Sequence, residues 1–274
     1  VTIPDSVTTI GEDAFYSCDR LTSVNIPDSV TTIGDAAFFE CDSLTSITIP
    51  DGVTAIGYLT FAGCDSLTSV TIPDSVTKIE EDVFNNCSSL TEFNGKFASE
   101  DGRCLIVDGV LNHFASYGLT EYTIPDSVTT IGTFAFYSCS SLKSITIPDS
   151  VTKIERHVFA YCYSLTSVII PNSVTTIEGG AFAYCYGLTN VTIGNSVTSI
   201  GENAFFECYS LTSINIPDSV TSIENGTFCS CYSLTSITIP DNVTTIGEGA
   251  FTCCESLTTI TIPDNVTSIG WGAF

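Results

Sequence analysis

Short segments in which apolar and polar residues alternate recur along the chain and predict β-strands. In Ser46-Ile47-Thr48-Ile49, for example, two isoleucines alternate with hydroxyl side chains, as expected for a half-buried strand. All ten prolines of the chain directly follow such a segment, and Gly194 takes this place in one repeat. Because proline has no N–H donor, it ends a hydrogen-bonded ladder. The pattern therefore predicts strands that stop at a turn.

A second apolar pattern comes after each Pro-Asp-Ser turn and predicts helical structure. Its consensus is Ala-Phe-x-x-Cys-x-x-Leu, as in Ala37, Phe38, Cys41 and Leu44. Apolar residues three or four positions apart share one face of a helix. We therefore expect one or two helical turns in each repeat.

The two patterns alternate because the chain is a tandem repeat. The isoleucine of the strand segment recurs every 23 residues, except for one interval of 52 residues between Ile72 and Ile124, which holds a regular repeat and one of 29 residues. A single unit of this size cannot bury its apolar face, whereas stacked units form a continuous core. We expect one continuous α/β repeat solenoid with a parallel β-sheet on one face and short helical turns on the other. Regular repeats should cover 1–92 and 124–274, with an irregular repeat and a β-hairpin insertion over 93–123.

Stacking aligns equivalent side chains into columns that run through successive repeats. We expect much of the core from a phenylalanine column: Phe15, Phe38, Phe61, Phe84, Phe136, Phe159, Phe182, Phe205, Phe228, Phe251 and Phe274. A cysteine column accompanies it: Cys18, Cys41, Cys64, Cys87, Cys139, Cys162, Cys185, Cys208, Cys231 and Cys254. Free cysteine is among the most buried residue types, so we interpret this column as a reduced packing ladder.

Three cysteines lie outside that column. Cys229 and Cys253 occupy nearly the same phase of adjacent repeats, so a disulfide between them is an alternative to two free thiols, and Cys104 is the third. The total of 13 cysteines is odd, so at least one thiol has no partner within the chain.

The irregular repeat contains Asp108-Gly109 between apolar runs, which is a strong hairpin signal. It also carries Lys96, Arg103 and His113, three of the few basic or titratable groups, on one projecting element. Two interpretations remain open. The insertion is either a structural spacer or an element that contributes to binding specificity.

Charge excludes several classes of partner. Acidic residues number 31 and Lys plus Arg only seven, which gives a formal net charge of −24. Nucleic-acid binding requires a basic footprint that seven scattered cations cannot build, and anionic membrane surfaces are disfavoured for the same reason. No apolar run approaches the length of a membrane span, so we expect no membrane insertion. Methionine is absent, even at position 1, and we therefore expect a fragment or a processed piece.

Tyrosines replace acidic residues in one surface column. The position after the column cysteine is Asp19, Asp42 and Asp65 early in the chain and becomes tyrosine later. A contiguous exposed aromatic strip often marks an interface. The alternative is that the tyrosines only cover neighbouring turns. The candidate partner-binding residues are Tyr161, Tyr163, Tyr184, Tyr186, Tyr209 and Tyr232.

The Pro-Asp turns produce a further acidic column. Aspartate favours such turns because its oxygens accept backbone N–H bonds, which explains the column without a ligand. Stacked carboxylates also offer the oxygen ligands that Ca²⁺ prefers. We keep weak Ca²⁺ binding as a minor hypothesis for Asp5, Asp28, Asp51 and Asp74, without any calcium-loop motif to support it.

No catalytic constellation is evident. The two histidines, His113 and His157, lie in different elements, and the sequence has no nucleophile elbow, phosphate loop or histidine pair for a metal. We expect neither an enzyme nor a cofactor.

The repeat L-x-x-I-x-I-P-x-x-V-x-x-I-x-x-x-A-F-x-x-C-x-x-L resembles the BspA-like branch of the leucine-rich repeat family over essentially the whole chain. This resemblance implies an extracellular or cell-surface scaffold for adhesion and for binding a protein or glycoprotein, without naming the ligand. The alternative is a structural protein whose solenoids self-associate into a filament or surface layer, because uncapped sheet edges invite stacking.

Overall fold

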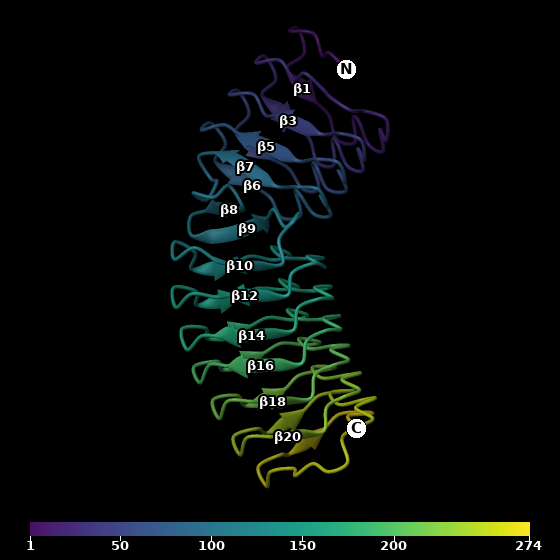
Figure 1. Ribbon diagram of the computed structural model, residues 1–274, viewed down its shortest axis with the longest axis vertical. Coiled ribbons are helices and arrows are strands. Elements are labelled where there is room, and N and C mark those ends of the chain that lie inside the picture. Colours follow the sequence, from purple (N-terminus) through teal and green to yellow (C-terminus); the bar gives the residue numbers. More distant parts are fainter. The chain divides into compact units, whose positions relative to one another are not determined.

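The computed structural model describes residues 1–274 and contains two compact units. Unit 1 comprises residues 1–108 with 112–118, and unit 2 comprises residues 109–111 with 119–274. The division falls inside the irregular repeat expected over 93–123. Within each unit, every regular repeat forms one coil of a β-solenoid, and Figure 1 shows the successive coils of unit 2 from teal to yellow.

The alternating segments form the predicted parallel strands. Partners in adjacent coils are equivalent residues of the repeat, as in the pairing of Ile145 with Val168, and Ile145 is buried between the exposed Ser144 and Thr146. In unit 1 the strands are β3 (Ser46–Thr48), β5 (Ser69–Ile72) and β7 (Glu92–Gly95). In unit 2 they are β10 (Glu121–Thr123), β12 (Ser144–Thr146), β14 (Ser167–Ile170), β16 (Asn190–Ile193), β18 (Ser213–Asn215) and β20 (Ser236–Thr238).

A second parallel ladder arises from the Val-Thr-x-Ile segments, which the sequence pattern did not identify as strands. Two-residue strands are too short to show an alternation of polar and apolar positions. In unit 1 they are β1 (Thr9–Ile10), β2 (Thr32–Ile33), β4 (Ala55–Ile56) and β6 (Lys78–Ile79). In unit 2 they are β11 (Thr130–Ile131), β13 (Lys153–Ile154), β15 (Thr176–Ile177), β17 (Ser199–Ile200), β19 (Ser222–Ile223), β21 (Thr245–Ile246) and β22 (Ser268–Ile269).

The predicted helical turns are wrong. The structure contains no helix, and the Ala-Phe-x-x-Cys-x-x-Leu segments form chains of tight turns instead. Around the column phenylalanine Phe182, the N–H groups of Gly180, Phe182 and Tyr184 donate to carbonyls of the next coil at 2.8 to 2.9 Å. The intervening N–H groups of Ala183 and Cys185 donate to carbonyls three residues back in their own coil. An α-helix would direct every N–H to the carbonyl four residues back.

Left-handed backbone at two positions of every coil produces this alternation. The φ angle is +65° at Gly180 and +61° at Tyr184, which lie two residues before and two residues after the column phenylalanine. Such residues interrupt a right-handed helix. Successive tight turns still bring apolar residues inward every three or four positions, and for this reason the sequence pattern resembled that of a helix.

The phenylalanine column forms the core of each unit, as predicted, except that Phe15 is half-buried and Phe274 is exposed. In unit 1 the Phe38 and Phe61 rings are stacked with their centroids 5.5 Å apart, and in unit 2 the Phe182 and Phe205 rings are stacked at 5.3 Å. All four of these side chains are fully buried. Offset stacking adds to the free energy that comes from burying the ring area.

The expected hairpin is confirmed. Strands β8 (Cys104–Val107) and β9 (Val110–Phe114) are neighbours joined by Asp108 and Gly109. The φ angle is positive at both turn residues, +50° and +79°, as a two-residue type I′ turn requires.

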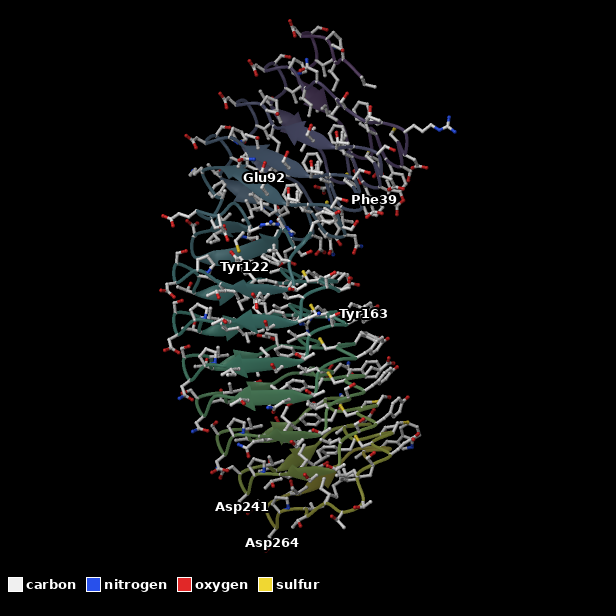
Figure 2. All side chains as sticks on the ribbon, viewed as in Figure 1. Phe39, Glu92, Tyr122, Tyr163, Asp241 and Asp264 are labelled. Atoms are coloured by element: carbon white, nitrogen blue, oxygen red, sulfur yellow. The ribbon has the colours of Figure 1, made fainter.

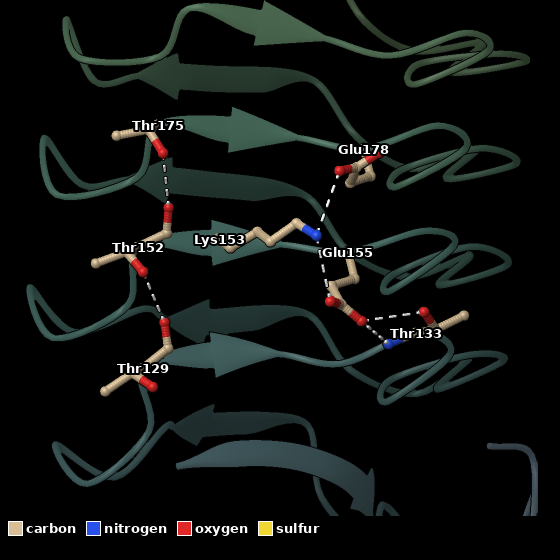
Figure 3. Close-up of polar contacts among 7 residues, drawn as sticks. All are labelled: Thr129, Thr133, Thr152, Lys153, Glu155, Thr175 and Glu178. Atoms are coloured by element: carbon tan, nitrogen blue, oxygen red, sulfur yellow. Dashed lines mark hydrogen bonds and ion pairs between the residues drawn. The ribbon is translucent and has the colours of Figure 1, made fainter. Parts of the chain in front are cut away.

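Hydroxyl side chains also connect adjacent coils. In unit 2 the Thr152 hydroxyl donates to the carbonyl of Thr129 at 3.2 Å, and the Thr175 hydroxyl donates to that of Thr152 at 3.3 Å (Figure 3). Lys153 lies within 3.3 Å of Glu155 and 3.4 Å of Glu178, so its ammonium bridges two coils (Figure 3). These residues therefore stabilise the stack, which accounts for their regular recurrence without a ligand.

Candidate functional site

The buried cysteine column positions the surface tyrosines. Cys185 and Cys208 are fully buried, and their thiols donate to the carbonyls of Phe159 and Phe182 in the preceding coil at 3.1 and 3.2 Å. Burial raises the pKa of the Cys185 thiol to about 12. All 13 cysteines are thiols in the structure. Because the cysteine side chain is directed into the core by this contact, the next residue in the chain is directed outward.

The tyrosine strip consists of the six predicted residues, and the structure brings all of them together in unit 2: Tyr161, Tyr163, Tyr184, Tyr186, Tyr209 and Tyr232. Figure 2 shows Tyr163 at one edge of the unit and the turn residues Asp241 and Asp264 at the opposite edge. The strip therefore lies away from the Pro-Asp turns.

The rings of the strip stack along the repeat direction. In the column that follows the cysteines, ring centroids are 5.0 Å apart for Tyr163 and Tyr186, 4.5 Å for Tyr186 and Tyr209, and 4.9 Å for Tyr209 and Tyr232. The planes of each pair lie within 23° of parallel. Each interior ring is thus covered on both faces, and the column presents ring edges and hydroxyl groups to solvent.

A second, shorter column lies beside the first. Tyr161 and Tyr184 stack at 4.4 Å, and each also makes an edge-to-face contact with the tyrosine two residues later. Sequence reasoning missed two further members of the cluster. Tyr137 contacts Tyr161 at 5.2 Å, and Phe206 contacts Tyr184 at 5.3 Å. Tyr137 and Phe206 each come directly after a column phenylalanine. Their equivalent position in the repeat could have identified them from the sequence.

Burial and Glu207 raise the pKa of three tyrosines in the strip. The Tyr209 hydroxyl donates to Glu207 Oε2 at 2.5 Å, and this hydrogen bond is the largest cause that raises the pKa of Tyr209, with burial as the second. Burial is the largest cause that raises the pKa of Tyr184 and Tyr186, and the charge of Glu207 adds to this effect. Tyr184 and Tyr186 therefore keep hydroxyl protons that can be donated to a partner at neutral pH.

The strip is partly exposed, and its rings hold one another in place. Tyr163 and Tyr232, at the two ends of the longer column, are 42% and 39% exposed, and the others are half-buried. Mutual packing fixes the rings before any partner arrives, so less conformational entropy is lost on binding. Preordered tyrosines of this kind are enriched in the energetic centres of protein interfaces.

The basic residues of the insertion contact both the insertion and the preceding repeat. Arg103 Nη1 donates to the carbonyls of Ala115 and Tyr117, both at 3.1 Å, whereas the Lys96 ammonium lies 4.8 Å from the centre of the Phe97 ring and donates to the Asp74 carbonyl at 3.5 Å. His113 is buried, its Nε2 atom has no hydrogen-bond partner, and burial lowers its pKa to about 4. The three side chains therefore do not form one exposed basic group.

The remaining candidate residues are dispersed. Asp5, Asp28, Asp51 and Asp74 are exposed, and the structure contains no group of three or more His, Cys, Asp or Glu side chains that could hold a metal ion. Cys229 is half-buried and Cys253 is exposed, both as free thiols, and the disulfide between them stays a prediction.

The repeat pattern, the paired strand ladders and the buried phenylalanine and cysteine columns coincide with a known family. Residues 1–99, 111–231 and 152–274 match the BspA-type leucine-rich repeat region. The chain belongs to this family. Its members are repeat scaffolds, and the resemblance inferred from the sequence is thereby confirmed. No curated protein sequence matches the chain.

Solved structures of bacterial leucine-rich repeat proteins share the fold. A leucine-rich repeat protein from Eubacterium ventriosum is 26% identical, with a TM-score of 0.84, and the match covers 100% of this chain and 81% of that one. A leucine-rich repeat protein from Bacteroides ovatus is 30% identical over 98% of this chain and 76% of that one, with a TM-score of 0.69. A protein from Faecalibacterium prausnitzii, described as a leucine-rich cell surface protein, is 29% identical over 95% of this chain and 78% of that one, with a TM-score of 0.59. This chain contains no helix long and apolar enough to cross a membrane.

Proposed function

We propose that this leucine-rich repeat chain is a non-enzymatic binding scaffold that uses the tyrosine strip of unit 2 to hold a protein or glycoprotein partner. The observation that carries the proposal is the stacked arrangement of six tyrosines whose rings are fixed, partly exposed and hydrogen-bond competent. A surface with no partner would need only small polar residues at these positions, as in the Ser and Asp of unit 1.

The environment of the cysteines and histidines supports a non-enzymatic role. The thiols of Cys162, Cys185 and Cys208 are buried, and burial raises their pKa values, which disfavours the nucleophilic thiolate form. His113 is enclosed in unit 1, and His157 stacks on Phe134 at 5.3 Å in unit 2.

An extracellular or cell-surface location for adhesion fits this scaffold. The related Faecalibacterium prausnitzii protein is described as a cell surface protein, and the net charge of −24 keeps the chain soluble and away from nucleic acids. Antibody labelling of intact cells of the source organism would test the location. Labelling only after the cells are permeabilised would contradict it.

Mutation of the strip tests the binding function. The purified chain would be screened against an array of extracellular proteins and glycoproteins, and each hit measured by biolayer interferometry. The double substitution Tyr186→Ser and Tyr209→Ser should weaken binding at least about 10-fold, as expected for loss of interface anchors. Tyr16→Ser is the matched control, because Tyr16 is a stacked tyrosine, 50% exposed, in unit 1. Equal affinity of the wild type and the double variant would contradict the proposal.

A further inference from the structure

The longer tyrosine column ends at Tyr232 in a way that identifies the chemistry of a partner. We propose that the strip binds an arginine-bearing segment of the partner, whose guanidinium group packs on the exposed part of the Tyr232 ring and pairs with Glu255. This inference rests on the proposed binding function and specifies its partner. It concerns one end of the strip only, so it can fail while the strip remains a binding surface.

Glu255 occupies the position at which the next ring of the column would lie. The Ser233 N–H donates to the Tyr209 carbonyl at 3.2 Å, and the Ser256 N–H donates to the Tyr232 carbonyl at the same distance. The backbone of Glu255 therefore lies relative to that of Tyr232 as the backbone of Tyr232 lies relative to that of Tyr209. Glu255 is exposed and takes part in none of the ion pairs of the structure.

Tyr232 has a stacked ring on one side only. Its ring stacks on Tyr209 at 4.9 Å, and the coil that carries Glu255 follows on the other side. The interior rings of the column, Tyr186 and Tyr209, have a stacked tyrosine on each side. Tyr232 is 39% exposed, so a planar group that packs on its exposed part would meet the carboxylate of the neighbouring coil.

A guanidinium group fits this position better than other cations do. It is planar, weakly hydrated and able to stack on an aromatic face while its N–H groups bind a carboxylate, whereas the lysine ammonium is a strongly hydrated point charge. Residues 157–274 contain nine acidic residues and neither Lys nor Arg, so this part of the chain supplies no competing Lys or Arg side chain. Glu207, already bonded to Tyr209, adds negative charge along the approach to the strip.

The preference for arginine over lysine is the quantity to measure. Fluorescence polarisation would compare labelled (Gly-Arg)4 and (Gly-Lys)4 peptides with the full chain at 50 and 150 mM salt. The arginine peptide should bind about 2- to 5-fold more tightly, because a cation–π contact at an exposed site has about this effect. Both Tyr232→Leu and Glu255→Gln should reduce this ratio toward one.

Two controls separate stacking from general attraction to an acidic protein. Tyr163→Leu changes the other end of the column, where the neighbouring position is Ser140 rather than an acid, and should leave the ratio unchanged. Asp42→Asn in unit 1 should weaken both peptides equally. Circular dichroism and urea unfolding would verify that every variant folds.

The inference would be overturned if the wild type bound the arginine and lysine peptides with equal affinity. It would also be overturned if Tyr232→Leu left the ratio of the two affinities unchanged. If the double substitution Tyr186→Ser and Tyr209→Ser still weakened binding of a screened partner in that case, the strip would stand as a binding surface and only the arginine assignment would fall.

Discussion

Units 1 and 2 share one coil geometry but differ in the column that follows the buried cysteines. In unit 1 the column holds Asp19, Asp42 and Asp65. Desolvation is the largest cause that raises the pKa of Asp42, and the negative charges of Asp19, Asp65 and Glu40 raise it further. In unit 2 the same column holds stacked tyrosines. One column thus contains repelling carboxylates in unit 1 and attracting rings in unit 2. Function can diverge at this position because neither side chain enters the core.

The largest expected effect tests whether the two cores are equivalent. Phe38→Ala in unit 1 and Phe205→Ala in unit 2 each remove a fully buried ring that stacks on both neighbours. Each should lower the free energy of unfolding by about 3 to 5 kcal/mol. Urea unfolding followed by tyrosine fluorescence, with hydrogen exchange to locate the loss, would measure this. If one substitution lowered the free energy of unfolding by less than half as much as the other, the two cores would not be equivalent.

The next effect tests the contribution of the tyrosine stack to stability. Tyr186→Ala removes two stacked contacts, and such aromatic pairs contribute about 0.5 to 1.5 kcal/mol each. We therefore expect a loss of about 1 to 3 kcal/mol on urea unfolding. Asp42→Ala at the equivalent position of unit 1 should leave stability equal or higher, since it relieves repulsion. Equal losses at both positions would remove the contrast between the two columns.

These contrasts show what the sequence could predict and what it could not. The phase of Tyr186 directly after Cys185 predicted an outward side chain, because the cysteine belongs to the buried column. The left-handed turns were not predictable from residue type, since the positions with positive φ hold Asp13, Ala36 and Leu59 as well as glycines. The burial of His113 depends on how the insertion folds against Phe84, at 5.4 Å, which no local pattern encodes.

Stability should depend on pH through His113 in unit 1 and, in the same direction, through His157 in unit 2, because burial lowers the pKa of both side chains. Burial lowers the pKa of His113 to about 4, below its ordinary value of 6.5, so between these values the unfolded chain binds a proton that the folded chain does not. Stability is therefore fully present above pH 6.5 and falls as the pH drops toward 4, by up to about 1.4 kcal/mol per pH unit. Urea unfolding at pH 7, 6 and 5 would measure the slope, which His113→Phe should flatten.

Asp82 acts in the opposite direction and must be controlled. Burial raises its pKa to about 6, so its contribution to stability declines as the pH rises from about 4 to 6. The comparison is therefore made in an Asp82→Asn background. An unchanged slope after His113→Phe in that background would rule out His113 as the source.

The smallest effect concerns the left-handed position two residues before the column phenylalanine. Unit 2 has Gly180, Gly226 and Gly249 there, whereas unit 1 has no glycine and holds Ala36 at φ +50°. Ala36→Gly should stabilise unit 1 by about 0.5 to 1 kcal/mol, because relief of the left-handed strain exceeds the added entropy of the unfolded chain. Gly249→Ala should cost about 1 kcal/mol for the same reason, since a Cβ there would meet no atom closer than 3.4 Å. Thermal unfolding would detect both shifts, and a destabilising Ala36→Gly would show that the strain is absorbed elsewhere in the coil.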